Sequence, residues 1–549
     1  MDVINFNIGI LGHVDSGKTS LSKALSTIGS TASFDKNPQS VERGITLDLG
    51  FSSFFMDVPG HLRSQTAASK FQITVVDCPG HASLIKTIIG GAQIIDAMVL
   101  VIDAIKGFQT QTAECLVIGE ITCDKMLIVI NKVDLYPKDK RSLMIEKMKK
   151  KISLTLQKTK FKDALIVPVS AKPNENENDP IGINELLEEM KNFLFIPKRL
   201  GNGPFIMAVD HCFSLKGQGT VMTGTILSGS VALGDTIEVP TLQVTKKVKT
   251  IQMFKKPVEK AIQGDRIGMC VTQLEAKSFE RGIVTSTGVA VLAYAGIMKV
   301  KRIPYYKQEI RTNSKMHVTM GHDTCMATVS FFGLYGAKGM EESFDYDKEY
   351  VHQNHLLDTV KLRADESNDT AIPGTQFCLL EFEKPLFVIP NSLTITSKFD
   401  TDIHTNTCRL AFYGRLSEIF HSDQYRTKEL PKLKVYKTKQ KEGVIERLVN
   451  EQEVIVKDLF KKETNVDLFT GLKVKLSTGE DGLIEGSFGK SGKVKVRVPG
   501  CLSSDTQAKL KTTKKKEKVE LETEAKNEVV NVYLNFKRFS YDQRKKILQ

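Results

Sequence analysis

The sequence predicts one α/β domain followed by three β-barrel-type domains, and two observations support this. With 549 residues, 41% of them hydrophobic, the chain is too long for one hydrophobic core and can fill several. Short apolar runs alternate with amphipathic stretches up to Pro197, after which short alternating strands and Gly-rich turns take over. The expected domains are 1–198, 199–289, 290–426 and 427–549.

The first domain is expected to contain a parallel sheet covered by helices on both faces. Its apolar runs are short and nearly continuous, as in strands that are buried on both sides, and amphipathic segments separate them. The five predicted strands are INFNIGIL, FQITVVD, AMVLVID, MLIVINK and ALIVPVS.

The later domains are expected to consist of antiparallel strands. GQGTVMTGTILSGSVALGDTIEV, LKVKL and VKVRV alternate apolar and polar residues around glycine turns. The polar segment from Gly336 to Thr370 predicts a long surface loop or partial disorder. The charged stretch from Lys511 to Asn527 predicts a solvated linker before a last strand, VVNVYLNF.

Charge and composition narrow the function classes. Residues 421–549 hold 29 Lys and Arg against 19 Asp and Glu, within a net charge of +13, which indicates a polyanionic partner such as nucleic acid or, alternatively, a solvated surface. The first residues lack the layout of a secretory signal, and Asp96 and Asp103 interrupt the longest apolar stretch, so we expect no membrane segment. Nine cysteines without a CxxC pair favour reduced thiols in a cytosolic protein.

The segment GHVDSGKT, from Gly12 to Thr19, fits the P-loop pattern between an apolar strand and a helix. In such a loop, backbone amides wrap the phosphates of a nucleotide at the helix N-terminus. Lys18 is expected to reach the β- and γ-phosphates, and the Thr19 hydroxyl to bind Mg²⁺. The predicted contacts of this loop are Asp15, Ser16, Gly17, Lys18, Thr19 and Ser20.

Two further segments predict that the base is guanine. Asp134 ends the motif Asn131-Lys132-Val133-Asp134, and its carboxylate can accept hydrogen bonds from guanine N1 and the exocyclic amine. Adenine would leave that carboxylate unpaired, which costs several kcal/mol. Ser170, Ala171 and Lys172 follow the run ALIVPV and are expected to form the second wall of the base pocket.

Two stretches read DxPGH, at 57–61 and 77–81, and only one can serve the nucleotide. We assign the second, because Asp77 ends a β-branched run, and treat the first as an incidental loop. Asp77 is then expected to hold Mg²⁺ through water, the Gly80 amide to sense the γ-phosphate, and His81 to orient the attacking water as the catalytic residue. Thr46, in the loop ERGIT, offers a second hydroxyl to Mg²⁺ and would be released when the γ-phosphate is lost.

These motifs, followed by a Gly-rich barrel, are similar to those of the translational GTPases that carry aminoacyl-tRNA. Ser16 departs from the histidine usual in ordinary elongation factors. The segments VERGITLDLGF, DCPGHASLIKTIIGGAQIID and VDHCFSLKGQGTVMTGTILSGS resemble the eukaryotic selenocysteine-specific elongation factors. The likeness covers nearly the whole chain and includes DIHTNTCRLAF and LFKKETNVDLF.

The resemblance implies a GTP/GDP-binding, Mg²⁺-dependent GTPase that delivers selenocysteinyl-tRNA to ribosomes at recoded UGA codons. Because the sequence shows no arginine finger in cis, GTP turnover is expected to be slow until the ribosome positions His81. The resemblance also implies an adaptor protein that binds the selenocysteine insertion element. We expect a cytoplasmic monomer, although the Lys-rich C-terminal run could also act as a nuclear signal.

The resemblance places a selenocysteine pocket at Asp210, His211 and Arg281. A selenol is more acidic than a thiol and is largely ionised at neutral pH, whereas a serine hydroxyl is neutral. Arg281 and a protonated His211 would attract the selenolate, and Asp210 would orient His211 and raise its pKa.

Other interpretations remain open at this point. One is an initiation-factor-like GTPase that carries initiator tRNA, and another is a non-hydrolysing GTP sensor that acts as an RNA-binding scaffold. The pairs His322 with Cys325 and His404 with Cys408 resemble zinc-ligand spacings, but packing in or beside strands explains them without a metal.

Overall fold

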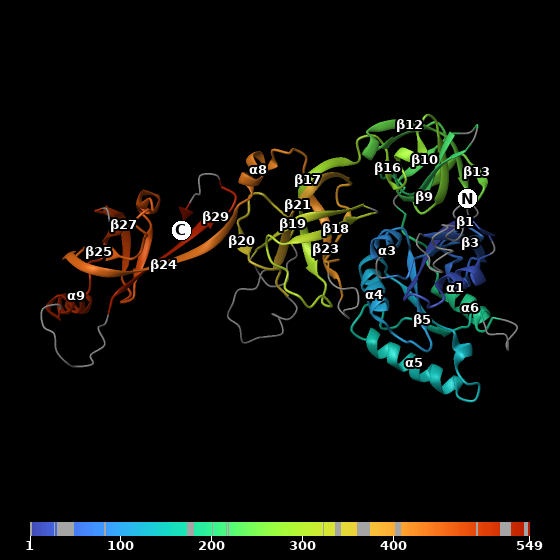
Figure 1. Ribbon diagram of the computed structural model, residues 1–549, viewed down its shortest axis with the longest axis horizontal. Helices are drawn as coiled ribbons and strands as arrows, with labels where there is room; N and C mark the ends of the chain where they lie inside the picture. Colours follow the sequence, from blue (N-terminus) through green and yellow to red (C-terminus); the bar gives the residue numbers. More distant parts are fainter. Residues whose placement is uncertain are drawn as a thin grey trace. The chain divides into compact units, whose positions relative to one another are not determined.

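The computed structural model forms two compact units, each described by itself (Figure 1). One unit contains Met1–Ser330, His355–Asp358 and Cys378–Ser422, and the other contains Phe331–Asn354, Thr359–Phe377 and Asp423–Gln549. The structure describes residues 3–26, 28–29, 49–81, 84–172, 180–199, 201–215, 217, 219–321, 323–334, 342–358, 374–400, 408–489, 492–516, 529–542 and 547–549. Thr46, His322 and His404 lie outside these ranges.

The first domain is built on a seven-stranded sheet in the order β2-β3-β4-β1-β5-β6-β7. The five strands that the sequence predicts are β1, β4, β5, β6 and β7, and they pair in parallel as expected. The sheet also has an antiparallel edge, β2 and β3, that the sequence analysis did not predict. The strands are β1 Val3–Gly12, β2 Ile28–Gly29, β3 Gly50–Asp57, β4 Lys70–Asp77, β5 Ala97–Asp103, β6 Met126–Asn131 and β7 Ile166–Pro168.

Helices cover both faces of this sheet and build two cores. The core on one face includes Ile89 and Leu116, and the core on the other includes Leu21 and Leu186, all at most 3% exposed. Helices α3, α4 and α5 therefore lie on one face, and α1 and α6 on the other. The helices are α1 Lys18–Leu25, α3 Ile85–Ala92, α4 Thr110–Thr122, α5 Arg141–Leu156 and α6 Ile183–Phe193.

The second domain is a closed barrel of antiparallel strands. Its sheet runs β11-β16-β8-β9-β15-β12-β13, and an additional pairing between β11 and β12 closes it. Closure removes free sheet edges, and the inward-facing aliphatic side chains fill the interior. The strands are β8 Ile206–Leu215, β9 Gly219–Ser228, β10 Ser230–Ala232, β11 Thr236–Val239, β12 Val244–Met253, β13 Lys256–Val258, β14 Lys260–Ile262, β15 Arg266–Val271 and β16 Gly282–Thr285.

The third stretch of strands completes the first unit. Strands β18, β22, β23 and β17 lie in this order in one sheet, and neighbouring strands are antiparallel. Strands β19 and β21 run from one unit into the other. The bounds are β17 Val291–Arg302, β18 Lys315–Met320, β19 Asp323–Leu334, β21 Thr375–Val388, β22 Leu393–Ser397 and β23 Leu410–Phe420.

The second unit is centred on a β domain with its own aliphatic core, which includes Val454 and Val494. The long strand β24 pairs with β25 and β29, and the order β25-β28-β27-β26-β29-β30 completes the sheet. The elements are α8 Tyr425–Lys428, α9 Ser504–Lys516, β20 Tyr350–Gln353, β24 Val435–Asn450, β25 Glu453–Lys457, β26 Lys473–Leu476, β27 Asp481–Phe488, β28 Lys493–Arg497, β29 Asn531–Phe539 and β30 Ile547–Leu548.

Two expectations about this unit are corrected. The segment expected to be a loop or partly disordered contains β20, because Tyr350 is fully buried and packs edge-on against Phe332 at 5.2 Å. The segment expected to be a solvated linker begins inside helix α9. The Ser503 hydroxyl accepts a hydrogen bond from the Thr506 amide at the start of this helix. The buried Leu510 anchors the helix to the domain core.

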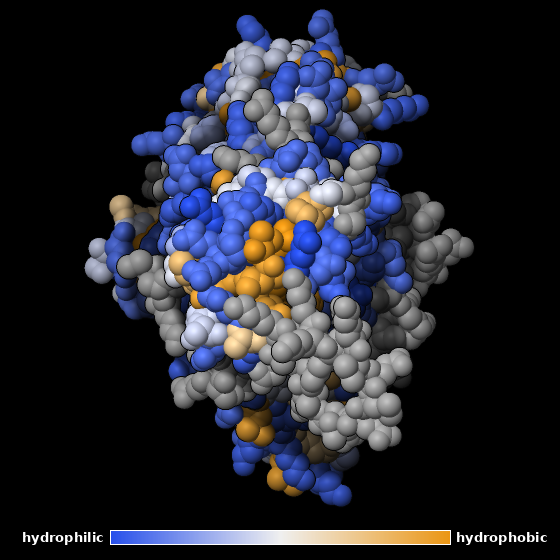
Figure 2. Space-filling view, turned by 90° about the vertical axis from the view of Figure 1, so that its left-hand side faces the viewer, coloured by the Kyte–Doolittle hydropathy of each residue, from blue (hydrophilic) through white to orange (hydrophobic). Residues whose placement is uncertain are grey.

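The described surface is mostly hydrophilic in the view of Figure 2, which also shows a compact apolar patch surrounded by hydrophilic residues. Among the described residues, no helix combines the length and the apolar character needed to cross a bilayer.

Candidate functional site

The P-loop connects β1 to α1 and is shaped by residues with positive φ. Asp15 has φ 60° and Gly17 has φ 87°, and Gly17 is the N-cap of α1. A Cβ on Gly17 would lie 2.2 Å from Asn131 Nδ2, so no larger residue fits beside that amide. The loop therefore presents its backbone at the start of a helix, where anions bind. Asp15 is exposed, and Ser20 lies half-buried on α1.

Lys18, Thr19 and Asp77 form the polar centre of this site. Lys18 is 6% exposed and donates to the His13 carbonyl at 2.7 Å, while Thr19 Oγ1 donates to Asp77 Oδ2 at 2.7 Å. Asp77 is 1% exposed, and its Oδ1 has no hydrogen-bond partner among the described residues. Burial raises the pKa of Asp77 to about 6, against the opposing effects of the Thr19 hydrogen bond and the Lys18 charge.

The structure brings the second DxPGH stretch, and not the first, to the P-loop. A Cβ on Gly80 would lie 2.2 Å from Lys18 Nζ, so Gly80 lies directly beside the lysine of the P-loop. The half-buried His81 follows it at the end of the segment that leaves β4. In the first stretch, His61 instead has its Nε2 3.3 Å from the Leu194 carbonyl, and Gly60 has open space around it.

The two base-pocket motifs are tied to the P-loop and to each other. Asn131 donates to the Ser16 carbonyl at 2.9 Å and accepts the Ala171 amide at 3.1 Å. Ser170 Oγ donates to Asp134 Oδ1 at 2.6 Å, which holds the carboxylate that would read guanine. Lys132 has φ 67° and an ion pair with Asp103 at 2.8 Å, while Lys172 is exposed.

A second polar cluster lies on the barrel of the second domain. The register of β8 against β9 shifts between Val209 and His211, so Asp210 is the extra residue of a β-bulge. Neighbouring strand side chains normally point to opposite faces, but the bulge lets His211 Nδ1 approach Asp210 Oδ1 at 2.8 Å. Thr223 Oγ1 donates to the same carboxylate at 3.0 Å.

Arg266 neutralises this carboxylate from strand β15. Its guanidinium donates to both Asp210 oxygens, at 2.6 and 3.0 Å, and both side chains are at most 5% exposed. Burial alone would raise the pKa of Asp210, but the charges and hydrogen bonds of Arg266 and His211 lower it below its usual range. Arg266 also lies with Cζ 3.1 Å from the ring centroid of Phe51 on β3.

Arg266 is absent from the predicted site residues, whereas Arg281 is among them. Arg281 directly precedes strand β16, whose first residue, Gly282, pairs with Val209, the neighbour of Asp210. Its guanidinium lies 3.7 Å from Glu280. Arg266 could have been found in the sequence as a charged residue at the start of the apolar run RIGMCV, since a buried charge in a strand needs a partner.

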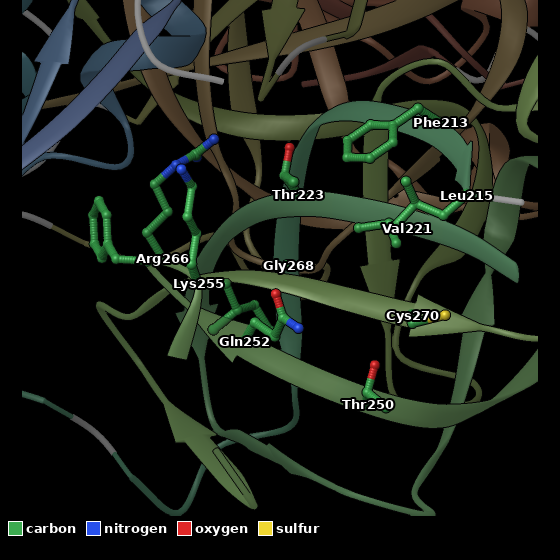
Figure 3. A pocket seen from close by; sticks show the side chains of 12 residues that line it. Phe213, Leu215, Val221, Thr223, Thr250, Gln252, Lys255, Arg266, Gly268 and Cys270 are labelled. Atoms are coloured by element: carbon green, nitrogen blue, oxygen red, sulfur yellow. The ribbon is translucent and has the colours of Figure 1, made fainter. Parts of the chain in front are cut away.

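The cluster borders a hollow of about 130 Å³, into which Thr223 and Arg266 project from neighbouring strands (Figure 3).

Family models match four consecutive parts of the chain. Residues 4–195 match the elongation factor Tu GTP-binding domain, and residues 219–285 match elongation factor Tu domain 2. Residues 297–414 match the third domain of eukaryotic selenocysteine-specific elongation factors, and residues 431–545 match the C-terminal RIFT domain of that factor.

Curated relatives and solved structures agree with these models. The selenocysteine-specific elongation factor of Mus musculus is 49% identical over 100% of this chain and 99% of its own length. That of Methanocaldococcus jannaschii is 32% identical over 90% of this chain and 94% of its own length.

A crystal structure of elongation factor SelB from Methanococcus maripaludis, in complex with the GTP analogue GppNHp, has a TM-score of 0.68 and 26% identity over 98% of this chain and 99% of that one. A bacterial selenocysteine-specific elongation factor shares the fold, with a TM-score of 0.56 and 21% identity over 75% of this chain and 58% of that one. With its P-loop, its guanine-type base motifs and its full-length likeness to the mouse protein, the chain belongs to the selenocysteine-specific elongation factors of eukaryotes, which are translational GTPases.

Proposed function

We propose that this chain binds selenocysteinyl-tRNA and delivers it to the ribosome at recoded UGA codons, with hydrolysis of GTP upon delivery. The observation that carries the proposal is the likeness to the mouse factor across the whole chain, which includes the domains after the GTPase domain. No observation favours initiator tRNA as the cargo or a non-hydrolysing scaffold.

The nucleotide site fits a Mg²⁺ ion together with the phosphates. The free oxygen of Asp77 and the adjacent Thr19 hydroxyl are hard oxygen donors, which Mg²⁺ prefers. Bound there, the ion would neutralise charge on the β- and γ-phosphates, and Thr46 would add a second hydroxyl. Lys18 and the Gly80 amide would face the γ-phosphate, and His81 would orient the attacking water.

In the proposal, the positive environment that an ionised selenol requires comes from His211 and Arg281, since Arg266 is already paired with Asp210. Asp210 engages Arg266 and holds Nδ1 of His211, which fixes the orientation of the imidazole ring. In the proposal, His211 and Arg281 attract the selenolate, and the Asp210–Arg266 pair fixes the position of His211.

The partners and the setting follow from the same proposal. An adaptor that binds the selenocysteine insertion element would link the complex to the messenger RNA. We propose a cytoplasmic monomer, with the Lys-rich run after Leu510 as a possible nuclear signal.

The cargo is tested by binding the GTP-loaded chain to selenocysteinyl-, cysteinyl- and seryl-tRNA in separate titrations. We expect the wild-type chain to bind the selenocysteinyl form more tightly than the other two. His211→Ala and Arg281→Ala should each reduce this difference in affinity while GTP affinity is unchanged. Equal affinity of the wild-type chain for seryl-tRNA and selenocysteinyl-tRNA would contradict the proposed cargo. If only one of the two substitutions reduces the preference for selenocysteinyl-tRNA, the other residue does not belong to the pocket.

The base is tested separately with Asp134→Asn. Asn can accept only one hydrogen bond from guanine but can donate to the 2-oxo group of xanthine, so GTP affinity should fall at least about 100-fold while XTP binds. An unchanged GTP affinity would contradict the role given to Asp134.

A further inference from the structure

The C-terminal β domain carries a hollow lined by cationic, apolar and amide-bearing residues. The hollow measures about 400 Å³, within the range of about 300–1,000 Å³ that small-molecule sites occupy. Strands β24 and β29, the loop before β26 and strand β30 form its walls. No Asp or Glu is among the described residues that line it, although Glu463 and Asp467 belong to the same loop.

Four cations lie on one face of the strand pair, and we call them the basic stripe. In the register of β24 against β29, Lys437 faces Arg538, Lys439 faces Phe536 and Lys441 faces Leu534, so these side chains share a face. Two cations directly opposite each other destabilise a sheet. The basic stripe consists of Lys437, Lys439, Lys441 and Arg538, and the last three line the hollow.

The basic stripe is not neutralised by carboxylates of the described chain. None of its members forms an ion pair within the described ranges, whereas Lys493 pairs with Glu446 at 2.6 Å and Lys495 with Glu453 at 2.8 Å in the same domain. Burial and neighbouring cations lower the pKa of both Lys437 and Lys441. Among the described residues, the basic stripe therefore keeps a positive charge that no carboxylate compensates.

Apolar and amide groups complete the walls. Leu468 is 53% exposed at the hollow, and the rings of Phe469 and Phe536, 5.3 Å apart at their centroids, close its floor. Lys441 Nζ lies 5.8 Å from the Phe469 centroid, so cation and apolar floor are adjacent. Asn465, which can offer a side-chain amide, also lines the hollow.

We propose that this hollow binds an unpaired nucleotide of single-stranded RNA, with its base against Leu468 and the apolar floor and its flanking phosphates on the basic stripe. Lys439 and Lys441 are two residues apart on a strand, about 7 Å by the rise per residue, so they can engage successive phosphates of one strand. Proteins recognise single-stranded RNA through apolar contact with the face of a base, polar groups at the edge of the base, and cations at the phosphate backbone. An acidic peptide would use the cations but offers no flat base for the floor.

This site deepens the proposed function, because it gives a tRNA-carrying chain a separate contact for RNA. The test uses the full chain and a short labelled oligouridylate, with affinity measured by fluorescence anisotropy as a function of salt. Lys439→Gln with Lys441→Gln should weaken binding by at least about tenfold at low salt and reduce the salt slope by about 1.4, that is about 0.7 for each lost phosphate contact.

The matched control removes the same charge from the same domain. Lys493→Gln with Lys495→Gln should leave the affinity within about twofold and the salt slope unchanged, because these lysines are paired with carboxylates. Equal losses in both double variants would overturn the site and leave only a general charge effect. Thermal unfolding confirms folding, and removal of like charges from the basic stripe should not lower the midpoint.

A second arm tests the base and the alternative ligand. Leu468→Ser should weaken oligouridylate several-fold and leave tripolyphosphate unaffected, since only the RNA has a base to place on the floor. Photocrosslinks from 4-thiouridine RNA should map to the segments 439–441 and 464–469. Crosslinks only elsewhere, or polyglutamate binding that exceeds RNA binding and depends on the basic stripe, would overturn the proposal. Binding of GTP and of selenocysteinyl-tRNA is measured on the same variants. This measurement distinguishes failure of the RNA site in the hollow from failure of the proposed function.

Discussion

Asp77 and Asp210 are both buried carboxylates at the end or bend of a strand, yet their surroundings differ. Asp210 receives two hydrogen bonds from a guanidinium, and its pKa falls below the usual range. The Thr19 hydroxyl donates a hydrogen bond to one oxygen of Asp77, and the other oxygen has no hydrogen-bond partner among the described residues. Burial raises the pKa of Asp77 to about 6. The Asp210 charge is neutralised by Arg266, whereas no described residue donates to Asp77 Oδ1.

The difference separates a site that is complete in the folded chain from one that a ligand completes. A buried charge is costly unless it is paired, and such pairing can come from the protein or from an ion. The Asp210 cluster is therefore preorganised before any cargo arrives. Under the proposed function, a bound cation would relieve the unfavourable free energy of the buried Asp77 carboxylate, which would link folding stability to nucleotide and Mg²⁺ binding.

Asp210→Asn should give the largest effect. It leaves Arg266 buried and uncompensated, so the free energy of unfolding should fall by about 3–5 kcal/mol in urea denaturation. Adding Arg266→Met should recover most of the loss, because both charges are then absent. A single-variant loss under about 1 kcal/mol would contradict the complete pairing inferred for this cluster.

Asp77→Asn should have the opposite sign in the nucleotide-free chain. Asn keeps an acceptor for the Thr19 hydroxyl and removes the unpaired charge, so the chain should gain up to about 3 kcal/mol, as the rise of the pKa to about 6 implies. The further stabilisation that Mg²⁺ with GTP gives the wild type should largely disappear. A destabilised apo variant would show that Asp77 is satisfied without a ligand.

The two carboxylates should also differ in their pH dependence, measured as unfolding free energy relative to each Asn variant. For Asp77 the folded pKa exceeds the unfolded value near 3.9, so the penalty is absent below about pH 4 and grows as pH rises through 6. For Asp210 the folded pKa is depressed, so its stabilisation is present above about pH 4 and is lost as pH falls further. Parallel profiles for the two residues would remove the distinction.

Ser170→Ala should give the smallest effect. It removes the hydroxyl that donates to Asp134 at 2.6 Å but leaves the carboxylate in place, so GTP affinity should fall by about 1 kcal/mol, or roughly fivefold. Isothermal titration with GDP and GTP measures the change. A loss as large as that of Asp134→Asn would mean that Ser170 contacts the nucleotide rather than positioning the carboxylate.

The sequence sufficed for the nucleotide site because its parts are local. The P-loop needs a strand, glycines at fixed spacing and a helix, and all of these lie within a short stretch around Gly17. The choice of Asp77 over Asp57 also followed from its β-branched strand, and the structure places Asp77, through its bond with Thr19, beside the P-loop. The antiparallel edge strand β3 was missed, although its apolar run was visible in the sequence.

The barrel cluster could be located but not completed from the sequence. Asp210 and His211 are adjacent, whereas Arg266 lies 56 positions after Asp210 and reaches it across β9. The bulge that brings His211 to Asp210 depends on the pairing of two strands. The basic stripe likewise arises from β24 and β29, which are far apart in the chain.

The sequence by itself determined the fold class and the guanine-nucleotide motifs, because each depends on residue types at short spacings that local backbone geometry enforces. The family followed from the resemblance of long segments to known members. Only the tertiary structure decided which charges are paired. Strand register brought Arg266 to Asp210 and placed Lys437 opposite Arg538, since pairing across a sheet joins residues whose distance along the chain carries no local signal.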